Sequence, residues 1–243
     1  MDVGNPVLTA VVVWLLYQAV VLAIWKINKV DYLHLADDRP TAVRSIVVPI
    51  GAGLALLAAA TTVLGWWDDV ITQPRTGPSW LLVVPALVAV MVVALIAGID
   101  WRHRNARAVL PLLLLGTLFV GAAEELLHRG LLVSAAQQAG WSLWQVYLFS
   151  TVLFGFLHAM NVLIGMPAAG GAVQVVTAFL GGTAFFVTLF ATGSLVVPVV
   201  LHALWDFALI GRTSTERPLK PWEAALVPVV YIVSLVAVFF LIR

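Results

Sequence analysis

Two carboxylates, an imidazole and a guanidinium lie close together in an otherwise apolar stretch of the chain: Glu124, Glu125, His128 and Arg129. Placing one charged side chain near the centre of a lipid bilayer costs roughly 2.5–3.5 kcal/mol on insertion scales. A chain that carries such a group of residues inside an apolar stretch is therefore expected to use them.

Two later stretches bring further ionisable residues at helical spacing. His158 follows Phe154 by four positions, and Asp206 follows His202 by four. Residues four apart share one face of a helix. The same spacing relates Glu124 to His128 and Glu125 to Arg129. We therefore expect each of these pairs to lie on one helix face.

The composition shows where these helices lie. The 243 residues are 62% hydrophobic and only 10% charged, whereas a soluble domain carries about 25% charged residues. This predicts one all-α, polytopic membrane domain. The net charge of +1 and the lack of a long basic run give no indication of a nucleic-acid partner. The absence of cysteine excludes thiol catalysis, disulfides and cysteine-ligated metals.

Eight apolar segments approach the length of about 20 residues that a helix needs to cross a bilayer. The first lacks the basic start and small-residue cleavage site of a signal peptide, so we interpret it as a retained span. The fourth is unusually long and stops at 137–140, which puts Glu124 near its middle. The expected spans are 7–25, 45–64, 80–99, 109–136, 141–165, 173–190, 195–210 and 224–242.

The connections divide the chain and orient it. We expect loops at 26–39, 168–171 and 212–221, among others, and a pair of glycines, Gly181 and Gly182, that allows close helix contact. Within a single membrane domain, 1–243, we distinguish three spans without motifs (1–108), a catalytic core (109–211), and a loop with the last span (212–243). Ten of the 13 basic residues follow spans one, three and seven: Lys26, Lys29, Arg39, Arg44, Arg102, Arg104, Arg107, Arg212, Arg217 and Lys220.

The positive-inside rule places those three basic connections in the cytoplasm and both termini on the outer side. The compact chain, without targeting extensions, suits an integral protein of a bacterial plasma membrane.

The fourth and fifth helices are expected to be antiparallel, with their turn near Gly140. Glu124 lies about as far before this turn as His158 lies after it, so the two can meet at one depth. A carboxylate and an imidazole on opposite sides of one water can activate it. His202, near the middle of the seventh helix, could donate to a developing oxyanion. The chemistry indicated is attack of water on an amide within the membrane, with Arg129 neutralising Glu125.

Three motifs on successive helices carry a family resemblance: Glu124-Glu125-x-x-x-Arg129, Phe154-x-x-x-His158 and His202-x-x-x-Asp206. In this order they resemble the motifs of the CPBP intramembrane proteases, which include the type II CAAX prenyl endopeptidases and the Abi, or bacteriocin-immunity-type, proteins. The resemblance covers roughly 110–211. It implies a glutamic intramembrane endopeptidase in which Glu124 and His158 activate water. It further implies His202 and residue 206 as the oxyanion pair, with Glu125 and Arg129 in support.

The last motif departs from the prenyl endopeptidases, which have Asn where this chain has Asp206. Many bacterial relatives carry Asp there. Since an ionised Asp cannot donate to an oxyanion, we expect Asp206 to orient and charge His202, leaving His202 as the sole donor. His128 is not demanded by the motif and could be a third imidazole near the water.

Other interpretations stay open. No cofactor is expected, but Glu124, His128, His158 and His202 could bind zinc, although the HExxH pattern is absent. Glu125–Arg129, His202–Asp206 and Phe154 could serve packing alone. A buried Glu/His relay also suits a proton-coupled transporter, although the sequence shows no repeat of paired, broken helices that would support one. A partner-binding scaffold could also keep a degenerate protease site.

The expected partners are a peptide or membrane-protein substrate, which can carry a lipid modification, and the lipid bilayer itself. Asn161 and Gln174 are further candidates for lining a cavity.

Overall fold

The computed structural model describes residues 4–104 and 106–243. In this part of the chain, eight helical segments are long and apolar enough to cross a membrane. The predicted all-α, polytopic membrane fold is therefore confirmed. The spans are Pro6–Ile27, Arg39–Leu64, Ser79–Ala97, Ala106–Gln138, Leu143–Ile164, Ala168–Thr192, Val196–Ser214 and Pro221–Leu241.

Several spans consist of more than one helical piece. The single helices are α1 (Pro6–Ile27), α9 (Ala168–Thr192), α10 (Val196–Ser214) and α11 (Pro221–Leu241). The second span joins α2 (Arg39–Ala42), the π-helical η2 (Val43–Val47) and α3 (Val48–Leu64). The third joins the 3₁₀ turn η3 (Ser79–Leu82) to α5 (Val83–Ala97), and the fifth joins α8 (Leu143–Leu157) to the 3₁₀ segment η5 (His158–Ile164). Two short elements lie in connections, η1 (Tyr32–His34) and α4 (Trp67–Ile71).

The fourth span is the long one, as predicted. It runs without a break through α6 (Ala106–Glu125), the π-helical η4 (Leu126–Leu132) and α7 (Val133–Gln138), 33 residues in all. Gly140 follows in the left-handed conformation, with φ of 73°, which glycine adopts without a steric penalty. Glu124 therefore lies near the middle of the span.

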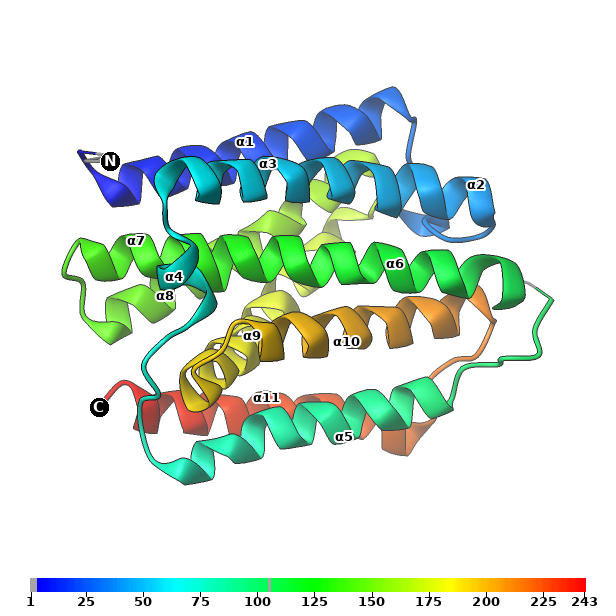
Figure 1. Cartoon of the computed structure of the whole chain (residues 1–243). Helices are drawn as coiled ribbons and strands as arrows, with labels where there is room; N and C mark the ends of the chain where they lie inside the picture. The colour runs from blue at the N-terminus through cyan, green and yellow to red at the C-terminus, as the bar shows by residue number, and fades with distance from the viewer. Residues whose placement is uncertain (1–3, 105) are drawn as a thin grey trace.

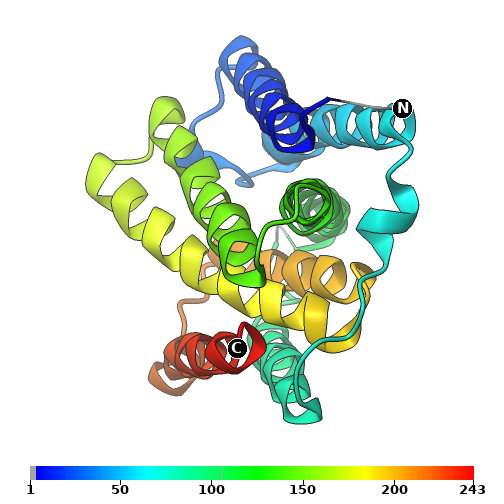
Figure 2. The same ribbon diagram turned by 90° about the vertical axis from the view of Figure 1, so that its left-hand side faces the viewer.

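This long span packs between other spans of the bundle and keeps one face of α6 exposed (Figure 2). Figure 2 looks along it and shows α6 between the α1–α3 pair on one side and α10 with α5 and α11 on the other. Both termini lie at the same end of the bundle (Figure 1). The connections from α1 to α2, α5 to α6 and α10 to α11 lie at the opposite end (Figure 1). The three basic connections thus share one end, as the orientation argument requires.

Helix α6 approaches α10 closely at Gly121. A Cβ atom on this glycine would lie 2.6 Å from the Val199 carbonyl oxygen and 2.9 Å from the Ala203 Cβ. Such distances are too short for a side chain, so only glycine permits this approach. The contact lies one turn before Glu124 and next to His202, and it brings the first and third motifs together.

Three expected boundaries were wrong. Residues 168–171 begin α9 and do not form a loop, because a run of Ala and Gly looks like a linker although Ala is the best helix former. The second span begins at Arg39, where the Asp38 side chain accepts from the Thr41 hydroxyl and from the Thr41 N–H. These two bonds, the one from the hydroxyl first, lower the pKa of Asp38 below its usual range. Helix α10 extends to Ser214.

The extension of α10 places Arg212 inside the protein, not in the predicted loop. Arg212 is buried, and its Nη2 donates to the Glu223 carboxylate of α11 at 2.7 Å. Further bonds run to the carbonyl oxygens of Leu95, Arg217 and Pro218. A buried arginine is tolerated because its charge is paired and its donors are used.

The Gly121 contact leads to the first prediction. Replacing Gly121 with Ala should destabilise the protein by about 1–3 kcal/mol, because the new methyl group overpacks the α6–α10 interface. Thermal unfolding in detergent measures the effect. Gly170→Ala is the matched control: its Cβ would meet only the Met166 Cγ at an ordinary 3.6 Å, so this variant should be unchanged or slightly stabilised. Equal stability of the two variants would contradict the interpretation.

Candidate active site

The first motif spans the junction between α6 and η4. Glu124 and Glu125 end the α-helix, and His128 and Arg129 lie in the π-helical segment. Side chains bind carbonyl groups in this wider turn: His128 Nδ1 lies 2.8 Å from the Glu124 carbonyl oxygen, and the Ser150 hydroxyl donates to the His128 carbonyl at 2.8 Å. Short π-helical segments inside α-helices are often found at functional sites.

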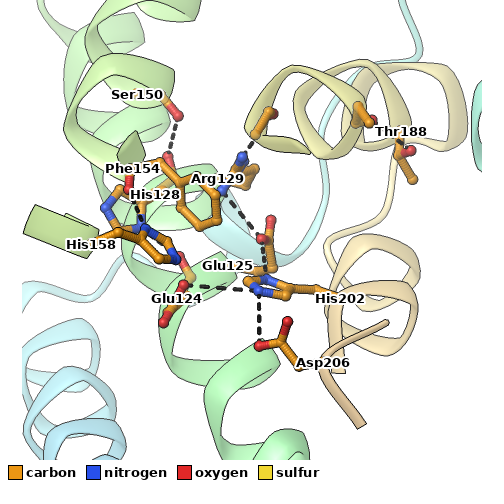
Figure 3. Close-up of polar contacts among 12 residues, drawn as sticks. Glu124, Glu125, His128, Arg129, Ser150, Phe154, His158, Thr188, His202 and Asp206 are labelled. Carbon is orange, nitrogen blue, oxygen red and sulfur yellow. Dashed lines mark hydrogen bonds and ion pairs between the residues drawn. The ribbon is translucent and has the colours of Figure 1, made fainter. Parts of the chain in front are cut away.

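The Glu125 carboxylate is the centre of a buried charge network (Figure 3). Its Oε1 accepts from Arg129 Nη1 at 3.2 Å and from His202 Nδ1 at 2.8 Å. Arg129 Nη2 donates to the Gly182 carbonyl oxygen of α9 at 2.7 Å. The Glu125–Arg129 contact expected from their spacing is present, and the network joins three spans at one depth.

Gly182 makes room for the arginine. A Cβ atom on it would lie 2.9 Å from Arg129 Nη2 and 2.9 Å from the Phe154 ring. The expected close helix contact at the glycine pair is therefore found at Gly182, where the space is filled by a guanidinium.

His202 lies between three carboxylates. The Nδ1 atom of His202 is hydrogen-bonded to Glu125. Its Nε2 atom lies 3.6 Å from Asp206 Oδ2 and 3.9 Å from Glu124 Oε2. Phe185 stacks on the ring at a centroid distance of 4.7 Å. Glu125, and not Asp206, is thus at hydrogen-bond distance from His202. The orienting contact that we expected from Asp206 comes from the first motif instead.

Glu124 and His158 line one cavity of about 110 Å³, together with Asp206. Such a cavity has room for several water molecules. Glu124 is 7% exposed, and its Oε2 makes no hydrogen bond to any residue that the structure describes. His158 Nδ1 lies 2.9 Å from the Phe154 carbonyl oxygen, which leaves Nε2 for a ligand. Figure 3 shows this imidazole beside the Glu124 carboxylate, as the antiparallel arrangement predicted.

Phe154 is the common packing partner of the site. Its ring covers the Arg129 guanidinium at 4.2 Å. It also makes edge contacts with the rings of His128, His158 and His202, at centroid distances of 5.1, 5.2 and 5.7 Å. This residue holds the imidazoles apart and shields the arginine from lipid.

His128 lines neither of the cavities beside Glu124 and His202, so the hypothesis of a third imidazole at the site was wrong. Its Nε2 accepts from the Trp14 indole N–H at 3.1 Å, and its Nδ1 lies against the Glu124 carbonyl. Both nitrogens are bonded, and the side chain is fully buried. His128 ties α1 to η4. Its partner lies 114 residues away along the chain, so no local pattern could have revealed it.

A second cavity, of about 140 Å³, lies on the other side of the site. Its lining includes His202, Trp205 and Tyr231. His158, Asp206 and Gln174 line both cavities. Asn161 and Gln174 both line the first cavity, which confirms that expectation. Sequence reasoning missed Tyr32 and Ser45 in the same wall, because single polar residues at segment ends give no periodic signal.

The residues of the zinc alternative do not gather as one ligand set. In the described part of the chain, no three His, Asp or Glu side chains are placed to hold a metal ion together. Both nitrogens of His128 are bonded elsewhere. The donor set expected for zinc would therefore have to rearrange before it could bind the metal.

A family comparison agrees with the geometry. Residues 106–208 match the family described as type II CAAX prenyl endopeptidase Rce1-like. This segment is similar to the endopeptidase domain of that family. It contains all three motifs, so the resemblance drawn from them is confirmed. No match was found among curated proteins. Together with the eight spans, this match indicates an integral, multi-pass membrane protein whose central segment is similar to CAAX-type intramembrane endopeptidases.

The buried charge network gives a second prediction. Arg129→Met should destabilise the protein by about 3–5 kcal/mol, because it removes one partner of the buried Glu125 carboxylate. Adding Glu125→Gln should restore part of the loss by removing the uncompensated charge. Thermal unfolding in detergent compares the two. Arg107→Met, at an exposed position of α6, serves as the control. If the double variant is less stable than Arg129→Met, Arg129 does not stabilise the protein by pairing with the Glu125 charge.

Proposed function

We propose that this protein hydrolyses a peptide bond within the membrane by means of a water held between Glu124 and His158. The observation that carries the proposal is that Glu124 lines a cavity shared with His158, while its buried Oε2 lacks a hydrogen-bond partner among the described residues. A carboxylate of this kind is available to a water molecule, whereas the neighbouring Glu125 is engaged by Arg129 and His202.

The proposed reaction needs no other nucleophile. Glu124 takes a proton from the water while the water oxygen attacks the carbonyl carbon of the substrate amide. The carbonyl oxygen becomes an oxyanion. When this tetrahedral intermediate collapses, the C–N bond breaks and the proton held by Glu124 passes to the leaving nitrogen. His158 accepts a hydrogen bond from the water through Nε2 and fixes its position.

His202 is proposed to bind the oxyanion through Nε2–H. Its Nδ1–H donates to Glu125 at 2.8 Å, so a ring that also donates from Nε2 must be the imidazolium. The carboxylates of Glu124 and Asp206 face Nε2 at 3.9 and 3.6 Å, and these negative charges favour that form. Asp206 would then stabilise the charge on His202 from its partly exposed position.

The family model supports the substrate class. We propose a peptide or membrane protein with a CAAX-type, lipid-modified C-terminus, presented from the bilayer. The alternatives of a transporter and of a non-enzymatic scaffold find no support in the family, and every residue of the three motifs is present. A bacterial plasma membrane with both termini on the outer side stays a prediction.

The roles of Glu124 and His158 can be tested with a farnesylated CAAX peptide that carries a fluorophore and a quencher. Glu124→Gln and His158→Ala should each lower cleavage by at least about 100-fold, since general acid–base catalysis contributes about 10²–10⁴. Thermal unfolding should show both variants folded. Glu216→Gln, an exposed Glu, should cleave like the wild type. Wild-type rates in the Glu124→Gln protein would refute the mechanism.

The zinc variant of the mechanism has its own test. Incubation with excess EDTA and membrane-permeant 1,10-phenanthroline should leave cleavage of the same peptide unchanged, since the proposed chemistry uses protein groups alone. Loss of activity that added Zn²⁺ restores would instead show metal-assisted hydrolysis.

A further inference from the structure

The cavity that contains Glu124 has a wall of uncharged polar side chains: Tyr32, Ser45, Asn161 and Gln174. None of them belongs to the three motifs. They come from four separate elements, η1, η2, η5 and α9. In a cavity otherwise lined by residues such as Val21, Ile46 and Leu157, such a wall requires an explanation.

Three of these side chains form a chain of hydrogen bonds. Asn161 Nδ2 donates to Gln174 Oε1 at 2.9 Å, and Gln174 Nε2 donates to the Tyr32 hydroxyl at 2.8 Å. Each side-chain amide has donors and acceptors beyond the bonds used here, because an amide can make about four hydrogen bonds. The chain of bonds therefore keeps capacity for a ligand.

Ser45 adds an independent observation. Its side chain is only 1% exposed, and its hydroxyl makes no hydrogen bond to any residue that the structure describes. The π-helical turn η2 presents it to the cavity. A buried hydroxyl without a partner costs about 1–3 kcal/mol, so its position is understandable if a bound molecule supplies the bond.

Gln174 lies between the two cavities that flank the site. Together with His158 and Asp206 it lines both cavities that flank the site. A peptide that extended from one cavity into the other would lie beside these three residues. His158 and Asp206 are site residues predicted from the motifs. Gln174 carries a side-chain amide, which has the same donor and acceptor groups as a peptide bond.

Tyr32 lies in the wall of the first cavity. It also lines a third cavity of about 210 Å³, which lies under the α1–α2 connection and includes Thr213 and Ser214. The turn that carries it is held by Asp31, whose carboxylate accepts from the Leu33 N–H at 3.0 Å. Gly165 allows this turn to dock, since a Cβ there would lie 2.9 Å from the Asp31 carboxylate. Burial raises the pKa of the Tyr32 phenol above its usual range, so the hydroxyl keeps its proton.

A physical requirement connects these observations. A peptide bond can be hydrolysed only in an extended segment, whose N–H and C=O groups have lost their helical partners. In the hydrocarbon region of a bilayer each unsatisfied backbone group costs several kcal/mol. An endopeptidase that works there must itself supply donors and acceptors beside the scissile bond.

We propose that Asn161 and Gln174 bind the substrate backbone next to the scissile bond, and that Tyr32 occupies Gln174 until a substrate peptide group replaces it. The inference rests on the proposed endopeptidase function and adds the residues that determine substrate affinity. It predicts effects of opposite sign: loss of the Gln174 amide weakens binding, whereas loss of the competing Tyr32 hydroxyl strengthens it.

The experiment measures binding of the fluorescent farnesylated CAAX peptide to full-length protein in detergent, with the Glu124→Gln substitution present throughout. Adding Gln174→Leu should weaken binding by about tenfold, as expected for loss of about 1.4 kcal/mol of hydrogen bonding. Adding Tyr32→Phe should strengthen binding by about two- to fivefold. In proteins with Glu124 intact, the same changes should appear in KM and leave kcat nearly unchanged.

Thr188→Val is the matched control. It lies on the same helix, α9, lines neither of the two cavities, and its hydroxyl already donates to the Ala184 carbonyl oxygen. Binding should therefore change less than twofold. Weaker binding in both Gln174→Leu and Tyr32→Phe, equal binding in all variants, or no binding by the Glu124→Gln protein would overturn the inference. Activity that persists in Glu124→Gln would overturn the catalytic mechanism alone, because binding is measured separately.

Discussion

The structure depends on one buried carboxylate. Glu125 lies in the interior of a membrane bundle and is held by Arg129 from its own span and by His202 from α10. Arg129 in turn binds the Gly182 carbonyl of α9. A buried charge must be paired, so this requirement fixes the relative position of three spans. The close approach at Gly121 and the space at Gly182 are the packing conditions under which the pairing can form.

Two adjacent glutamates thus experience different surroundings. The Oε2 atoms of both glutamates lack a partner among the described residues, but Glu125 accepts two hydrogen bonds through Oε1, whereas Glu124 lines the cavity shared with His158. Consecutive residues of a helix point about 100° apart, which directs one carboxylate to the charge network and the other to the cavity. One fold therefore contains a structural acid and a reactive acid side by side, and the first positions His202 for the second.

The sequence predicted the parts that depend on local spacing or on the turn at Gly140. These are the eight spans, the long fourth helix, the Glu125–Arg129 pair and the meeting of Glu124 with His158. It did not predict contacts whose partners lie far apart without periodicity, such as Trp14 with His128, Arg212 with Glu223, or Tyr32 with Gln174. The mistaken role of His128 has the same origin: helical spacing gives the face of a side chain but not the neighbour that it meets.

The π-helical segment η4 also sets the rotational phase of the fourth span. Before it, α6 presents Glu124 and Glu125 to the site; after it, Ser134 donates to the Asp69 carbonyl oxygen and Gln137 donates to Gln73. An α-helix turns by about 100° for each residue. A chain shortened by one residue within η4 could satisfy either the carboxylate pair or the contacts of α7, but not both. The length of η4 therefore fixes how the half of the helix that carries the glutamates is rotated relative to the half that α7 anchors.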